Sequence, residues 1–155
     1  MKTKSIISTL LFISFFAITL SSCSDSDEGD TTKPVINLIS PAENSNLKIG
    51  NEKGIHLEMD LSDNEELASY KIDIHGNFDG HGHKSDDGTV VFKYSNSWKV
   101  SGKNAHIHQH EIIVPDNATA GNYHLMVFCV DAAGNESYVA RNIVLSPEGG
   151  DDEEH

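Results

Sequence analysis

The 155-residue chain has only two cysteines and few basic residues. Cys23 is predicted to carry a lipid, which leaves Cys129 without a cysteine partner in this sequence. We therefore expect Cys129 to pack as a small buried hydrophobic group without a disulfide. Lys and Arg number 11 against 24 Asp and Glu, which gives a formal net charge of −13 at pH 7. Because phosphate backbones repel such a chain, the composition argues against a nucleic-acid partner.

The sequence also lacks the motifs of common enzyme classes. It contains no nucleophile elbow, no glycine-rich loop that would hold a phosphate and no zincin-type helix motif. No residue stands out as a general base beside a substrate pocket. We therefore expect that the protein is not an enzyme.

The N-terminus has the charge and hydropathy order of a secretory signal peptide, because two lysines precede an apolar run over residues 6–20. This run is shorter than the roughly 20 residues that span a bilayer. It ends at Leu20-Ser21-Ser22-Cys23, which fits the lipobox pattern of an aliphatic residue, two small residues and a cysteine. The pattern predicts a lipoprotein signal peptide over residues 1–22 and lipidation of Cys23, with an ordinary signal peptide and an incidental cysteine as the alternative.

Polar, acidic segments flank the central part of the chain. Residues 23–33 are predicted to form a solvated tether from the lipidated cysteine, and residues 147–155 an acidic disordered tail. The acidic stretch after Cys23 resembles the export signal of Bacteroidota-type lipoproteins, which implies an outer-membrane lipoprotein exposed at the cell surface. A plain linker is the alternative and leaves a periplasm-facing protein. In both cases the lipid anchor is the contact with the membrane.

The central residues 34–146 form one predicted domain, in which apolar residues alternate with polar ones. Ile55, Leu57, Met59 and Leu61 show this alternation most clearly. About seven short strands separated by turns are typical of an all-β sandwich. The predicted strands cover residues 35–39, 55–62, 67–75, 89–94, 98–100, 106–114, 123–130 and 138–145.

Two motifs near the end of the domain carry a family resemblance. Gly121-Asn122-Tyr123 before an alternating strand, followed by the Asp131–Ser137 turn, resembles the closing hairpin of bacterial Ig-like and fibronectin-like domains. This implies a tyrosine at a corner and a turn that joins the last two strands. The whole arrangement is similar to an uncharacterised family of small, histidine-bearing Bacteroidota lipoproteins with one antiparallel Ig-like domain, which implies a fold but no activity.

Nine histidines are present, and several fall in two short clusters. The first contains His75, His81 and His83, and the second contains His106, His108 and His110. On a strand, residues at alternate positions share one face and lie about 6.6 Å apart. Imidazole favours zinc and copper over calcium and magnesium, so the clusters predict an all-nitrogen transition-metal site, with Asp79 as the nearest carboxylate.

The Ig-like topology predicts where the clusters lie. The third strand pairs with the sixth, so His75 and His124 are expected together on an outer face, with His81 and His83 on the loop beyond. If Val114 is buried, strict alternation along the strand places His110, His108 and His106 on the inward face. Burial of three unpaired imidazoles costs free energy unless they bind a metal. A bulge at Ile112–Ile113 would turn these imidazoles outward. One shared site and two separate sites both remain open.

These observations predict a lipid-anchored protein that captures or buffers zinc or copper, beside an outer-membrane transporter. The expected metal ligands are His75, His81, His83, His106, His108, His110 and His124. The alternative is an Ig-like module that binds a glycan or a protein partner without metal. A glycan face would need an exposed, flat row of Phe92, Tyr94 and Trp98. The acidic turn at Asp63 has oxygen ligands for calcium, but we expect it to be a solvated turn.

Overall fold

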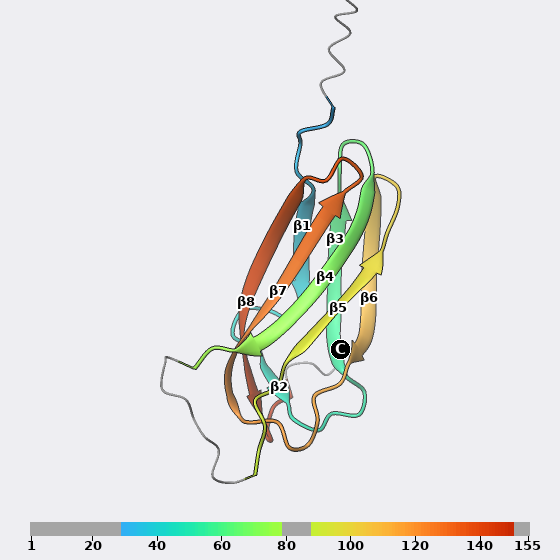
Figure 1. Cartoon of the computed structure of the whole chain (residues 1–155). Helices are drawn as coiled ribbons and strands as arrows, with labels where there is room; N and C mark the ends of the chain where they lie inside the picture. Colours follow the sequence, from blue (N-terminus) through green and yellow to red (C-terminus); the bar gives the residue numbers. More distant parts are fainter. Residues whose placement is uncertain (1–28, 79–87, 151–155) are drawn as a thin grey trace, which may run out of the picture.

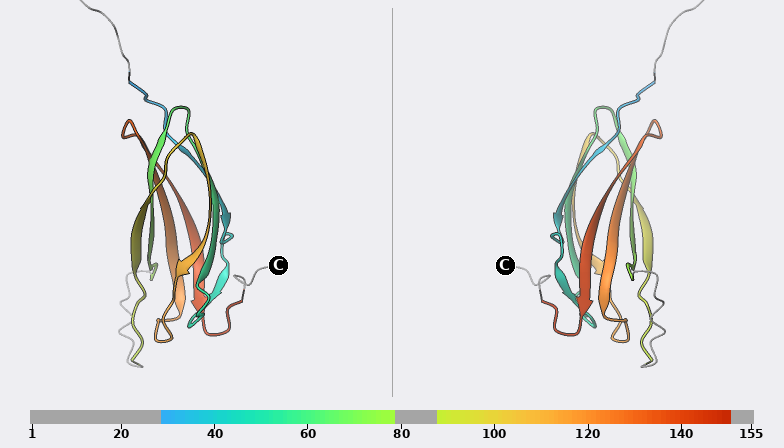
Figure 2. Two further views of the ribbon diagram at one scale, coloured as in Figure 1. Left: turned by 90° about the vertical axis from the view of Figure 1, so that its right-hand side faces the viewer. Right: turned by 90° about the vertical axis from the view of Figure 1, so that its left-hand side faces the viewer.

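A computed structural model describes residues 29–78 and 88–150. In this part of the chain the structure is all strand, without helix, in two sheets that Figure 2 shows as two facing layers. The smaller sheet has the order β1 (Val35–Ser40), β3 (Ile55–Ser62) and β6 (Asn104–Ile112). The larger has the order β2 (Asn46–Lys48), β8 (Glu136–Ser146), β7 (Gly121–Asp131), β4 (Leu67–Gly76) and β5 (Tyr94–Lys99). The predicted all-β sandwich is confirmed.

Several predictions concern residues outside the described ranges. These are the signal peptide over residues 1–22, the lipidation of Cys23, the ligands His81 and His83, and the end of the tail. No helix suited to crossing a membrane occurs within residues 29–78 and 88–150.

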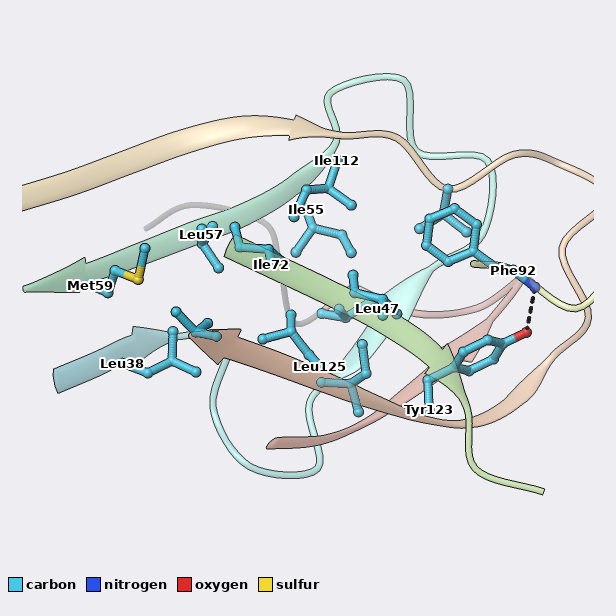
Figure 3. Packing of buried hydrophobic residues seen from close by; sticks show 14 of the residues in the cluster. Leu38, Leu47, Ile55, Leu57, Met59, Ile72, Phe92, Ile112, Tyr123 and Leu125 are labelled. Carbon is cyan, nitrogen blue, oxygen red and sulfur yellow. Dashed lines mark hydrogen bonds between the residues drawn. The ribbon is translucent and has the colours of Figure 1, made fainter. Parts of the chain in front are cut away.

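The alternation of apolar and polar residues builds the core between the sheets. Ile55, Leu57, Met59 and Leu61 of β3 are each at most 1% exposed and face the equally buried residues of β4 and β7. Figure 3 shows Ile55, Leu57 and Met59 packed with Ile72 and Leu125 of the other layer. Burial of one such side chain contributes about 1.5–3 kcal/mol, so the strand faces are fixed by the core. The polar residues between them therefore point away from it, on the outer faces of the sandwich.

Tyr123 occupies the corner position that the resemblance implied. Its hydroxyl donates a hydrogen bond to the carbonyl of Thr119 at 2.7 Å. It accepts one from the backbone N–H of Phe92 at 3.2 Å, which Figure 3 shows. The ring is fully buried, and burial raises the pKa of the phenol. Tyr123 thus ties the segment before β5 to the start of β7.

The predicted strands over residues 89–94 and 98–100 are only partly right, because residues 98 and 99 belong to a longer strand and most of the first segment is not a strand. A single strand, β5, begins at Tyr94, and the preceding segment makes only one isolated bridge, between Val90 and Ala118. Phe92 is buried in the core, and its N–H bonds to Tyr123 instead of a neighbouring strand. The structure also adds the three-residue β2, which is too short to show an alternation and pairs with β8 in parallel, so the expected purely antiparallel sandwich needs this correction.

Candidate metal centre

The second histidine cluster is turned outward by a β-bulge between β3 and β6. Leu57 lies opposite Gln109 and Ile55 lies opposite Ile112, so two residues of β6 stand opposite the single His56 of β3. The inward orientation obtained by counting back from Val114 is therefore wrong, because the extra residue reverses the alternation. The bulge lies at residues 110–111, two positions before the expected one. It keeps Ile112 in the core and the imidazoles out of it.

Three histidine rings meet across this bulge. The ring centres of His56 and His108 are 4.9 Å apart, and those of His56 and His110 are 5.1 Å apart with an angle of 6° between the planes. The rings of His108 and His110 are 5.4 Å apart. One nitrogen of each ring lies within 4.8 Å of one nitrogen of the other two. We call these three residues the three-histidine cluster.

His56 supplies the observation that separates this cluster from an ordinary wet surface. Its Nε2 is inaccessible to solvent and has no hydrogen-bond partner in the described part of the chain. The nearby carboxylate of Glu58 has Oε2 at 3.8 Å, too far for a hydrogen bond. Leaving a buried polar atom unpaired costs about 1–3 kcal/mol, and a bound cation would remove that cost.

His106 lies beside the cluster but does not belong to it. Its Nδ1 is 2.8 Å from Asp60 Oδ1, and its Nε2 is 3.8 Å from Glu58 Oε1. The hydrogen bond from His106 is the main reason why the pKa of Asp60 is lowered. Glu58 thus has one oxygen toward His56 and the other toward His106, so it is a carboxylate next to the three-histidine cluster. The predicted carboxylate, Asp79, lies outside the described residues.

His56 was missed by the sequence prediction, although it alternates outward on β3. It stands alone in the sequence, and no local spacing links it to the cluster at His106–His110. Only the β3–β6 register brings it opposite the bulge. His56 could have been predicted as a ligand from the pairing of β3 with β6 together with the outward position of His56 on β3.

The other described histidines form a separate pair on the larger sheet. His75 and His124 are direct partners in the β4–β7 ladder, and their ring centres are 5.5 Å apart at an angle of 86°. Their expected proximity is confirmed. His75 Nδ1 is 2.8 Å from Asp73 Oδ1, a hydrogen bond that orients the ring. Since this pair and the three-histidine cluster lie on different sheets, the described histidines form two groups.

The exposed aromatic row required for a glycan face does not exist. Phe92 is only 8% exposed and packs in the core. Trp98 stacks on Tyr70 with ring centres 5.0 Å apart and donates its indole N–H to Glu111 Oε2 at 3.2 Å. The glycan half of the alternative therefore loses its structural basis.

Comparison with known families gives one match, to a domain of unknown function designated DUF4625, over residues 21–146. The chain belongs to this family. No curated protein matches it. Membership in the DUF4625 family agrees with the expected uncharacterised domain and brings no activity with it.

The chemistry open to this DUF4625 chain follows from its donor atoms. The three-histidine cluster offers imidazole nitrogens, with Glu58 as an adjacent carboxylate. Such a set suits zinc or copper and suits calcium or magnesium poorly. Cys129 cannot contribute a thiolate, because it is fully buried and burial raises the pKa of its thiol to about 11.

Proposed function

We propose that this protein binds a transition metal ion, zinc or copper, through His56, His108 and His110, and that it captures or buffers the ion outside the cytoplasm. The observation that carries the proposal is the buried, unpaired Nε2 of His56, in a ring that has one nitrogen within 4.8 Å of a nitrogen of each of two other rings. A solvated histidine surface gives no reason for such an atom, whereas a metal ion satisfies it.

The spacing requires only small movements. With Zn–N bonds of 2.0–2.1 Å, two nitrogens on a tetrahedral zinc are roughly 3.4 Å apart. The nitrogens of the cluster start within 4.8 Å of one another, and rotations about side-chain torsions can close the remaining gap. Glu58 is the proposed fourth ligand, because its Oε2 is already 3.8 Å from His56 Nε2. Four protein ligands suit storage or transfer of the ion better than catalysis.

The other predicted ligands that the structure describes, His106, His75 and His124, are not ligands of the proposed ion. His106 flanks the cluster through Asp60 and Glu58 and supports the orientation of Glu58. His75 and His124 are only two ligands, so a second ion at their position needs His81 and His83 from the neighbouring loop.

Localisation completes the proposal. Lipidation at Cys23 would hold the protein on the outer membrane, at the cell surface or facing the periplasm, beside a transporter that uses the captured ion. The lipobox and the acidic stretch after it support this as a Bacteroidota-type lipoprotein. The Tyr123 corner and the β4–β7 pairing support an Ig-like sandwich as the carrier.

The test is calorimetric titration of the full chain, purified in detergent and freed of metal by a chelator, with zinc and with copper. We expect a dissociation constant below about 10 μM for at least one of them. His108→Gln/His110→Gln should weaken binding at least about 100-fold, because it removes two proposed ligands and the loss of an outer-shell partner alone costs about 10- to 100-fold. The matched control, His75→Gln/His124→Gln, removes two outward histidines from the other sheet and should change this affinity less than about threefold. Binding that is absent, or that survives the first variant, contradicts the proposal.

A further inference from the structure

Three aspartates meet at the end of the sandwich opposite the histidine bulge. Asp30 precedes β1, Asp63 follows β3, and Asp131 ends β7. One carboxylate oxygen of each lies within 4.8 Å of one oxygen of the other two. Figure 1 shows the chain before β1 entering at the end of the sandwich where the β3–β4 and β7–β8 turns lie. We call this group the aspartate cluster.

Backbone donors hold two of these carboxylates in fixed orientations. Asp63 Oδ1 accepts hydrogen bonds from the N–H groups of Glu65 and Glu66, each at 2.9 Å. Asp131 accepts from the N–H and the side-chain amide of Asn135, both at 2.7 Å. Both carboxylates are therefore positioned by their own turns.

Asp30 is bound to both turns although it lies outside the sandwich. Its Oδ1 accepts from the side-chain amide of Asn64 at 3.0 Å, and its carbonyl accepts from the amide of Asn135 at 2.9 Å. Hydrogen bonds from the Thr32 backbone and from Asn64 lower the pKa of Asp30, so it is ionised at neutral pH.

The second oxygens of Asp30 and Asp63 have no such partners. Asp30 Oδ2 and Asp63 Oδ2 are each inaccessible to solvent and accept no hydrogen bond from the described residues. Asp131 itself is only 2% exposed. The turn at Asp63, expected to be solvated, thus hides two unpaired anionic oxygens beside a third buried carboxylate.

No positive side chain among residues 29–78 and 88–150 compensates this cluster. The four ion pairs found there join histidines to Glu58, Asp60 and Asp73, and none of them involves a member of the aspartate cluster. Lys103, which approaches the turn, donates instead to the carbonyl of Asn64. Buried carboxylate oxygens without donors, such as the Oδ2 atoms of Asp30 and Asp63, are costly when no counter-charge is near, and a bound cation would remove this cost.

We propose that a calcium ion binds between Asp30, Asp63 and Asp131 and fixes the segment before β1 to the end of the sandwich. The ligand set is all oxygen, which suits calcium or magnesium and not the metals proposed for the histidines. Calcium–oxygen bonds of 2.3–2.6 Å allow two ligands to lie up to about 5 Å apart, whereas magnesium allows about 4 Å. Three oxygens bound to one calcium can all lie about 4.5 Å apart from one another. The separations within the cluster, up to 4.8 Å, therefore need to contract by only a few tenths of an ångström.

The consequence of this ion is mechanical. A cation shared by Asp30 and two turns converts the link between the N-terminal segment and the sandwich from hydrogen bonds into ionic ligation. The segment before β1 is then held more tightly at millimolar calcium than without calcium, when the hydrogen bonds of Asp30 with Asn64 and Asn135 hold it. The site lies about 23 Å along β3 from His56, seven residues at the strand rise, so the two metals are independent.

The test measures thermal unfolding of the full chain in detergent, with 10 mM calcium and with a chelator. An affinity of roughly 0.1–1 mM, as in extracellular calcium modules, raises the melting temperature by roughly 5 °C. Asp30→Asn should abolish most of this rise without endangering the fold, because Asp30 lies outside both sheets. Asp116→Asn, an exposed aspartate at the other end, is the matched control and should keep the full rise.

The outcomes separate this inference from the zinc proposal. His108→Gln/His110→Gln should keep the calcium response, and Asp30→Asn should keep zinc binding. The calcium site is contradicted if calcium raises the melting temperature equally in Asp30→Asn and in the unchanged chain, or if calcium does not raise it at all. An equal rise with magnesium overturns the assignment to calcium. Calcium titration by calorimetry, with at least a tenfold weaker affinity in Asp63→Asn, is the second measurement.

Discussion

The two ends of the sandwich differ in how they gather their polar side chains. At one end, imidazoles project from strands, and their positions are set by the β3–β6 register and its bulge. At the other, carboxylates sit on turns and a preceding segment, held by backbone N–H groups. One small sandwich thus gathers nitrogen donors on a sheet face and oxygen donors at a loop end, and each donor set suits a different class of cation.

The largest expected difference between the two ends is their response to pH. Protons compete with the metal ion for imidazole nitrogens, so the zinc affinity of a three-histidine site should fall steeply as the pH is lowered from about 7.5 to about 5.5. Calcium affinity should change less than about threefold over that range, because its ligands are carboxylates and hydrogen bonds lower the pKa of Asp30. Calorimetry at several pH values checks both. A flat zinc profile removes imidazole ligation from the account.

A substitution of His56 should change the histidine end in two opposite directions. His56→Leu removes a ligand and should weaken zinc binding about 30-fold. It also removes the buried, unpaired Nε2, so the metal-free chain should gain about 1 kcal/mol in free energy of unfolding. Urea unfolding with chelator and with zinc separates the effects. A loss of stability without metal would mean that His56 has a structural role instead.

The smallest expected effect concerns the neighbour that lies outside the cluster. Asp60 accepts a hydrogen bond from His106, and both side chains are more than half exposed. Asp60→Asn should therefore change zinc affinity less than about threefold. A loss of tenfold or more in the same titration would bring His106 into the ligand set and enlarge the cluster.

The sequence supports the fold further than it supports the sites. Alternation in β3, β4 and β7 predicts the sandwich, and the expected pairing of β4 with β7 places His75 beside His124. Both follow from local periodicity and a known topology. The conformation around Phe92 does not follow from periodicity, because its side chain is buried in the core although the residue is not part of a strand.

The two clusters depend on contacts that local patterns do not contain. The three-histidine cluster needs the bulge opposite His56, whose position is set by how Ile112 and Ile55 fit the core. The aspartate cluster joins Asp30 to a turn 105 residues away, at Asn135. Neither spacing is visible in sequence, whereas the residue types alone do suggest the class of ligand.

Anomalous diffraction at the zinc edge, from crystals of the zinc-loaded full chain, tests the central claim most directly. The account predicts one peak 2.0–2.1 Å from a nitrogen of each of His56, His108 and His110. A peak elsewhere, or rings that stay separated in the presence of zinc, would contradict it.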